Sequence, residues 1–184
     1  MAGLLPALPD AARVWTFAVL GDVPVSRPAG APELGAELHA SVHEFTRHWA
    51  SHGRPVPADA ADVTPPDFPG AVLAVAAQLS DAEVNAGVSG CGIDAMQHAV
   101  EAAVAVAGAR LVPALTVGYR DADGRWQVVS RPAFRALTKQ GEADGATPVL
   151  DLTATTLGAL RTDGVERAAG EAWHGRAFRL SAPA

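Results

Sequence analysis

The segment Gly-Val-Ser-Gly-Cys-Gly-Ile-Asp, residues 87–94, together with the residues on either side of it, gives the clearest prediction of the fold. It lies between an apolar run, residues 71–77, and an alanine-rich run, residues 94–107. The first run has the length of a buried strand, and the second carries its larger apolar residues at helical spacing. A strand, a glycine-rich loop and a helix in this order form a common cradle for an anion or a substrate. The sequence therefore predicts a binding site here, without indicating a reaction.

The size and composition of the chain predict a single globular domain over residues 1–184. Hydrophobic residues make up 49% of the 184 residues, which is enough for one sizeable core. Residues 1–11 and 180–184 are expected to be loosely held. Residues 54–70 contain five prolines and are expected to form a surface loop.

Charge and cysteine content exclude several classes of protein. The net charge of −6 is opposite to that of a nucleic-acid-binding surface. The single cysteine excludes an internal disulfide and a zinc site built from several cysteines. The most apolar window, residues 99–117, is interrupted by Glu101, Arg110 and Pro113, so no membrane span is expected. The N-terminus lacks the basic region of a secretory signal, and the cytoplasm is the expected location.

The pattern of apolar residues predicts an α+β or α/β fold, with helices packed on a single mixed sheet. Its expected element order is β-α-β-α-β-β-α, followed by a stretch, residues 149–160, that fits either a strand or a helix. The expected strands are 13–20, 71–77, 111–119 and 126–130, and the last two form a hairpin through the turn 121–124. The expected helices are 32–51, 94–107, 131–139 and, at the end of the chain, 165–173.

Cys91 is the first candidate for chemistry. A thiol near a helix N-terminus is close to unpaired backbone N–H groups, which lower its pKa and favour the nucleophilic thiolate. The carboxylate of Asp94, one turn later, acts against that effect. Three roles stay open for Cys91: a buried structural thiol, a nucleophile, or a side chain that merely lines a ligand site.

The glycine loop matches none of the common nucleotide or nucleophile motifs. A P-loop needs a lysine at the end of its glycine-rich loop, and the only lysine is Lys139, far from residues 87–94, so ATP hydrolysis of that kind is not expected. Cysteine stands where a nucleophile elbow around Ser89 would need its second glycine. Ser89 is more simply a helix cap. Ser89, Gly90, Gly92 and Asp94 are therefore candidate ligand-binding residues, with loop amides available for a small anion.

The histidines do not form a predicted metal site, and no cofactor is expected. His39 and His43 fall about 180° from His48 and His52 around the expected first helix, so four ligands cannot converge. His52 ends that helix and is the better functional candidate, either as a catalytic base or as a partner of the last carbonyl groups. His98 is a second possible base.

Tryptophans are expected to anchor the core or an interface. The chain has four of them, at positions 15, 49, 126 and 173. For the pair Trp173-His174, a core role and a ligand-contacting role both stay open.

Three features together resemble a small family of uncharacterised bacterial proteins typical of Bacteroidetes and their relatives. They are Arg-Val-Trp at residues 13–15, the helix end containing Phe45, Trp49, His52 and Gly53, and Ser-Gly-Cys-Gly-Ile-Asp at residues 89–94. The resemblance covers residues 12–175. The family motif reads Ser-Gly-Cys-Ser-Ile-Asp, so Gly92 replaces a serine. Family members are often labelled ABC transporter ATPases, a label that the missing Walker lysine does not support. The resemblance implies a cytosolic single domain and no established activity.

Two hypotheses of function follow from these residues. The first is a binding or protein-interaction module, with its site at residues 87–94 and an unknown protein or a small anion as partner. The second is a thiol-dependent enzyme with Cys91 as nucleophile and His52 or His98 as base. A homodimer built on exposed tryptophans is a further possibility.

Overall fold

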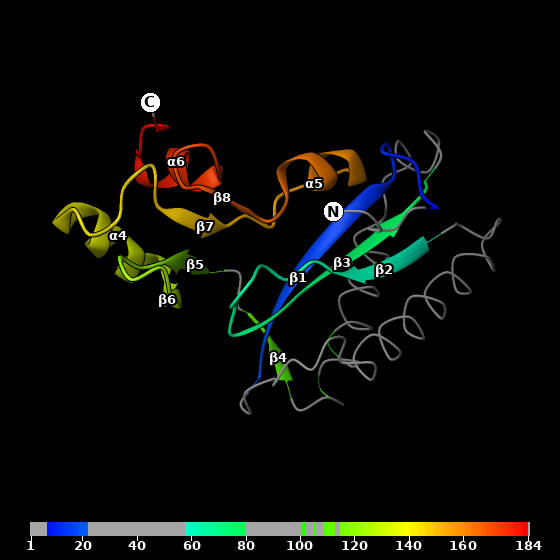
Figure 1. Ribbon diagram of the computed structural model, residues 1–184, viewed down its shortest axis with the longest axis horizontal. Coiled ribbons are helices and arrows are strands. Elements are labelled where there is room, and N and C mark those ends of the chain that lie inside the picture. The colour runs from blue at the N-terminus through cyan, green and yellow to red at the C-terminus, as the bar shows by residue number, and fades with distance from the viewer. Residues whose placement is uncertain are drawn as a thin grey trace.

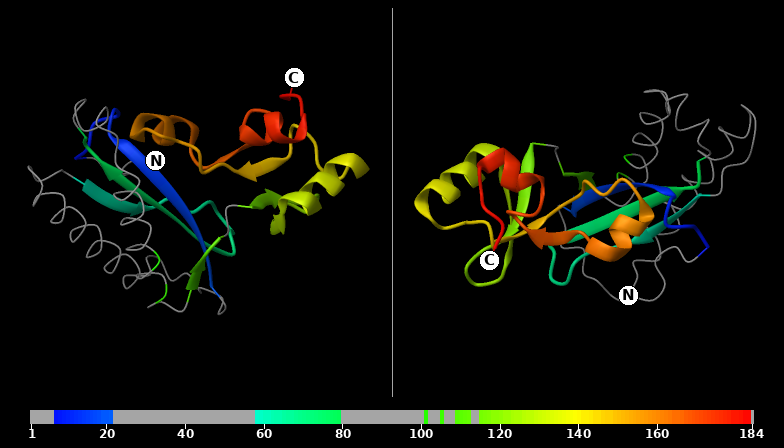
Figure 2. Two further views of the ribbon diagram at one scale, coloured as in Figure 1. Left: turned by 180° about the vertical axis from the view of Figure 1, so that it is seen from behind. Right: turned by 90° about the horizontal axis from the view of Figure 1, so that it is seen from above.

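The computed structural model describes residues 7–21, 58–79, 101, 105, 109–112 and 115–183 (Figure 1). The described strands form two antiparallel four-stranded sheets, with the orders β2-β3-β1-β4 and β6-β5-β7-β8. Helices α4 and α6 lie at the end of the described structure away from β2, and the views in Figure 2 agree on this arrangement.

The first sheet is built around β1 (Arg13–Gly21) and β3 (Gly70–Ala77). These two strands pair along their whole length, from Arg13 opposite Ala77 to Leu20 opposite Gly70. All eight residues of β3 are buried, as expected for an apolar run covered on both faces. A Cβ atom on Gly70 would lie 1.9 Å from the carbonyl oxygen of Val19, so only glycine allows β3 to start this close to β1.

Two short strands complete the first sheet at its edges. β2 (Ala58–Asp62) pairs with β3, and β4 (Ala109–Leu111) pairs with the C-terminal end of β1. Because β4 is only three residues long, it covers a small part of the β1 edge. This short coverage leaves room for the pocket described below.

The second sheet starts with a hairpin of β5 (Thr116–Arg120) and β6 (Trp126–Ser130). Helix α4 (Arg131–Gln140) follows without a break. The Ser130 side chain caps it by accepting a hydrogen bond from the N–H of Ala133, and Gly141 ends it in the left-handed conformation, with φ of 76°. Phe134 is the buried residue of this helix.

The rest of the second sheet comes from the last third of the chain. β7 (Pro148–Leu150) pairs with β5 and with β8 (Glu166–Ala168), and α5 (Leu157–Asp163) connects β7 to β8. α6 (Trp173–Phe178) then packs next to α4, with the rings of Phe134 and Phe178 centred 5.0 Å apart.

Residues 151–157 connect the second sheet to the part of the β1 edge that β4 does not cover. The Thr16 hydroxyl donates to the carbonyl of Leu152 at 2.9 Å, and the N–H of Val14 donates to the carbonyl of Thr155 at 3.2 Å. On the other side, the indole of Trp126 and the guanidinium of Arg120 both donate to the carbonyl of Pro66. These long-range bonds fix the two sheets against each other.

Apolar side chains of the described residues form two clusters. The larger core joins β1, β3 and α5 with Phe68, Trp126 and Leu150. The smaller core is centred on Phe134, in contact with β5, β7 and α6. Only two polar side chains are buried among the described residues, Asp151 and His174.

The α+β class predicted from the sequence is confirmed, although the strands divide over two sheets. The strands predicted at 13–20 and 71–77 and the helix from residue 131 are present. The strand predicted at 111–119 is divided: its start belongs to β4 in the first sheet, and only β5 (Thr116–Arg120) forms the predicted hairpin with β6. Part of the expected loop 54–70 forms β2, because this polar segment pairs with the edge of β3. The predicted helix 165–173 is wrong. Its first part is β8, which pairs with β7, and a helix begins only at Trp173.

Candidate functional site: a pocket between the two sheets

The site residues predicted from the sequence lie outside the described residues. This holds for the catalytic candidates Cys91 and His52, for the alternative base His98, and for the loop residues Ser89, Gly90, Gly92 and Asp94. Their roles stay predictions from the sequence. The described residues do form a different candidate site.

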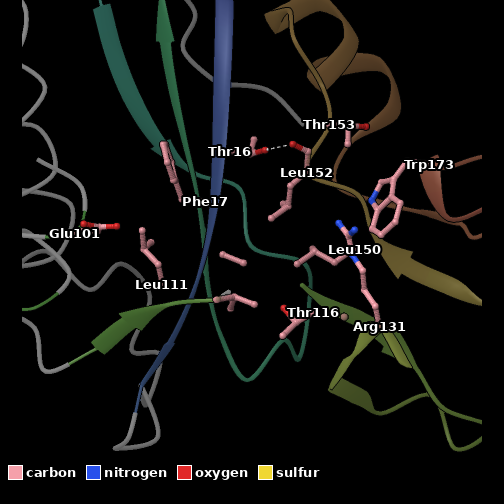
Figure 3. A pocket seen from close by; sticks show the side chains of 13 residues that line it. Thr16, Phe17, Glu101, Leu111, Thr116, Arg131, Leu150, Leu152, Thr153 and Trp173 are labelled. Carbon is pink, nitrogen blue, oxygen red and sulfur yellow. Dashed lines mark hydrogen bonds between the residues drawn. The ribbon is translucent and has the colours of Figure 1, made fainter. Parts of the chain in front are cut away.

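A pocket with a volume of about 550 Å³ lies between the two sheets (Figure 3). β1 supplies Thr16, Phe17 and Ala18 to its wall, and β4 with the residue after it supplies Leu111 and Val112. The second sheet, α4 and α6 supply the opposite wall. Sites for small molecules have volumes of roughly 300–1,000 Å³, so this pocket is of the right size for one.

The pocket exists because the edge of β1 is covered in two separate pieces. β4 ends where the N–H of Val112 donates to the carbonyl of Ala18, at 2.8 Å. The segment after β7 takes over where the N–H of Val14 donates to Thr155. Backbone groups of alternate residues face the same edge of an antiparallel strand. The N–H and C=O of Thr16 therefore face this gap, and no described backbone group bonds them there.

Most of the described wall is apolar. Six of its side chains are large and hydrophobic, namely Phe17, Leu111, Val112, Leu150, Leu152 and Trp173. Apolar walls of this kind hold a ligand by removing its hydrophobic surface from water, at about 25 cal/mol per Å². The wall therefore favours a ligand with an apolar body.

Arg131 and Trp173 form one side of the pocket together. Arg131 is the first residue of α4, and its guanidinium carbon lies 4.6 Å from the centre of the Trp173 ring. Figure 3 shows its side chain reaching up beside Leu150 and Trp173. Stacking on an aromatic ring holds a guanidinium in place, and its N–H groups point outward in the plane of the group.

The remaining polar groups of the described wall are hydroxyls and one carboxylate. Thr16, Thr116 and Thr153 contribute hydroxyl groups, and Glu101 contributes the carboxylate on the side away from Arg131 (Figure 3). The Thr153 hydroxyl donates to the buried carboxylate of Asp151 at 2.6 Å. Asp151 also pairs with Arg167 at 3.6 Å. That ion pair compensates the buried negative charge beneath the pocket.

His174 lies behind Trp173 in the smaller core and does not line the pocket. It is fully buried, its ring is 3.9 Å from that of Trp173, and neither ring nitrogen has a hydrogen-bond partner. Burial is the main cause that lowers its pKa, to about 4. Arg131 lowers this pKa further, and Asp151 opposes the effect. His174 is therefore neutral at pH 7 and acts as a core residue, while its neighbour Trp173 contacts the pocket.

This arrangement is suited to binding. The described wall residues include no histidine and no cysteine. Within the described ranges, no group of three or more metal-binding side chains occurs. The same part of the chain contains no helix with the length and apolar character needed to cross a bilayer.

The sequence alone did not point to Arg131 as a functional residue. One signal was present, because a positive charge at the first position of a helix opposes the helix dipole. α4 has no acidic residue in its first turn, and its basic Lys139 stands in the last turn where the dipole favours it. The stacking of Arg131 on Trp173 and its place in the pocket wall are visible only in the structure.

No known protein family matches the chain, and neither a curated protein nor a solved structure is found to be similar to it. The resemblance described from the sequence therefore stays a prediction.

Proposed function

We propose that the protein is a binding module that holds a small, largely apolar molecule in the pocket between its two sheets. The observation that carries this proposal is the pocket of about 550 Å³, with six large hydrophobic side chains and few polar groups. Binding sites for small molecules combine these two features. We further propose, from the sequence, that the protein acts in the cytoplasm.

Glu101, which lines the pocket, follows the last residue of the predicted loop, Asp94, by seven positions in the sequence. The alternative, a thiol-dependent enzyme with Cys91 as nucleophile, stays a prediction from the sequence.

Binding of N-phenyl-1-naphthylamine, an uncharged dye that fluoresces in apolar sites, tests the proposal. We expect saturable binding of one dye per chain. Leu111→Trp should abolish it, because the larger ring fills space next to Phe17 and Val112 in the wall.

Leu115→Trp is the matched control. Leu115 is 68% exposed and is not among the described wall residues, so the same added ring should leave dye binding unchanged. Circular dichroism of both variants checks that they are folded. Equal dye affinity in Leu111→Trp and the unchanged protein would show that the dye binds elsewhere, and the proposal would then be wrong.

A further inference from the structure

Several polar side chains of the described wall already interact with other groups of the protein. This holds for Arg131, Glu101 and Thr116, which each take part in an interaction within the chain. Two further hydroxyl groups belong to the wall, those of Thr16 and Thr153, and the structure gives the direction of their hydrogen bonds. These two hydroxyls therefore indicate which polar group a ligand should carry.

Both hydroxyl protons are used inside the protein. Thr16 donates to the carbonyl of Leu152 at 2.9 Å in a partly buried position (Figure 3). Thr153 donates to the carboxylate of Asp151 at 2.6 Å. A hydroxyl group has one proton and two lone pairs. Each oxygen can thus still accept a hydrogen bond, but it has no second proton to donate.

Neither hydroxyl can turn its proton toward a ligand without a loss elsewhere. The bond from Thr16 helps to hold residues 151–157 on β1. The bond from Thr153 serves the carboxylate of Asp151, which is buried, and a buried charge that loses a hydrogen bond is destabilised. This side of the pocket therefore presents hydrogen-bond acceptors to a ligand.

Thr16 is the better placed of the two acceptors. It lies in the middle of β1, opposite Ala74 of β3, so its backbone is fixed by the sheet. Thr16 is half-buried, whereas Thr153 is exposed, and a hydrogen bond is stronger where water is excluded. A charged donor such as an ammonium group would lose its hydration against the apolar wall. The expected donor is therefore an O–H or N–H group of a neutral molecule.

We infer that the ligand of the pocket is a neutral, largely apolar molecule with one O–H or N–H group that donates a hydrogen bond to the hydroxyl oxygen of Thr16. This inference rests on the proposed function, because it names the chemical class of the molecule that the pocket holds. It assigns Thr16 as a specificity-determining residue, which selects a hydrogen-bond donor over an ether of similar shape.

Two naphthalene derivatives separate the donor from the apolar body. 1-Naphthol carries a hydroxyl group and is neutral at pH 7, whereas 1-methoxynaphthalene has a methoxy group in its place and cannot donate. Both are measured as competitors of N-phenyl-1-naphthylamine. We expect 1-naphthol to bind at least about threefold more tightly, although the methoxy compound has more apolar surface. Thr16→Val should remove this preference, because valine has the shape of threonine without the oxygen.

Two variants serve as controls for Thr16→Val. Thr16→Ser keeps the hydroxyl oxygen and should keep the preference for 1-naphthol. Thr138→Val removes a hydroxyl that donates to the carbonyl of Arg135 at 2.9 Å in an exposed position on α4, outside the described wall. It should also keep the preference. Circular dichroism checks that all three variants are folded.

Each outcome gives a decision. Equal affinity of the two competitors for the unchanged protein, or a preference for 1-naphthol that survives Thr16→Val, overturns the inference and leaves the proposed function standing. Failure of N-phenyl-1-naphthylamine to bind at one site overturns the proposed function and the inference together. A preference that is lost in Thr16→Val and kept in Thr16→Ser and Thr138→Val supports both. The comparison in the unchanged protein decides alone if Thr16→Val does not fold.

Discussion

The two hydrophobic cores formed by the described residues are built on different principles. The larger core joins strands and α5 through aliphatic side chains such as Val72, Leu157 and Leu160, and it contains no buried polar side chain among the described residues. The smaller core is a group of rings around Phe134, and it includes the fully buried His174. The first contains no side chain that titrates near neutral pH, whereas the second also depends on the protonation state of His174.

The difference matters for the pocket. Trp173, which holds Arg131 in place, packs against the smaller core and lies directly over His174. Any change that disturbs the ring core should therefore reach the side of the pocket lined by Trp173 and Arg131. Changes deep in the larger core should lower stability with less effect on that side.

The largest expected effect on the free energy of unfolding comes from replacing one large buried side chain in each core by alanine. Phe134→Ala and Leu160→Ala remove side chains that are 0% and 1% exposed. They should lower the free energy of unfolding by about 3–5 and about 2–5 kcal/mol respectively, measured by urea denaturation. Only Phe134→Ala should also weaken binding of N-phenyl-1-naphthylamine, because Trp173 in the pocket wall packs on the ring core. A similar loss of dye affinity in Leu160→Ala would show that the two cores are not separate in function.

The second expected effect is a dependence of the free energy of unfolding on pH, caused by the titration of His174. Its pKa in the folded protein is lowered to about 4 from 6.5, so the unfolded chain binds more protons between these pH values. The contribution of the neutral His174 to the free energy of unfolding is fully present above pH 6.5. It decreases as the pH falls to about 4, and below that pH it changes no further. The total change is up to about 3 kcal/mol, because each pKa unit corresponds to about 1.4 kcal/mol.

His174→Leu isolates this contribution. The groups around the ring are the aromatic side chains of Phe134, Trp173 and Phe178, with the charges of Asp151 and Arg131 nearby. The variant has no group to protonate there, so its stability should decline less between pH 6.5 and 4 than that of the unchanged protein. Parallel curves for the two proteins, measured by urea denaturation at each pH, would show that His174 does not titrate as described.

The smallest expected effect on stability comes from removing ion pairs. It should distinguish an ion pair that connects structural elements from an ion pair that lies on the surface. Arg120 donates to Glu166 at 2.6 Å, stacks on Trp126 and donates to the carbonyl of Pro66. Glu166→Gln should lower stability by about 1 kcal/mol. Asp123→Asn removes the carboxylate that pairs with Arg125 at 3.5 Å, where both side chains are more than 70% exposed, and should change stability by less than about 0.5 kcal/mol. Equal effects in thermal denaturation would contradict this ranking.

The sequence predicted the elements whose own residues show a clear pattern. β1 and β3 are apolar and of strand length, the β5–β6 turn contains Asp and Gly, and α4 starts with proline after a serine cap. β2, with the sequence Ala-Asp-Ala-Ala-Asp, has no strand pattern and exists because it pairs with β3. β8 reads Glu-Arg-Ala, residues that favour a helix, and pairing with β7 overrides this preference.

The described site was beyond prediction for a related reason. Its wall combines residues from β1, β4, β5, β7, α4 and α6, and their meeting depends on how the two sheets pack. Trp173 was recognised from the sequence as an aromatic anchor with two open roles. Arg131 was recognised only as the start of a helix, since its stacking partner lies 42 positions later in the chain.

The divided edge of β1 also has a consequence for how the chain folds during synthesis. Thr16 near the beginning of the chain bonds to Leu152, 136 positions later. While the protein is being made, β1 can pair with β3 and then with β4, but residues 151–157 reach the part of its edge near Val14 and Thr16 only when the last fifth of the chain has left the ribosome. An unpaired strand edge readily associates with strands of other chains. The nascent protein is thus most exposed to misassembly late in translation, and substitutions in residues 151–157 should reduce its yield in cells more than its final stability.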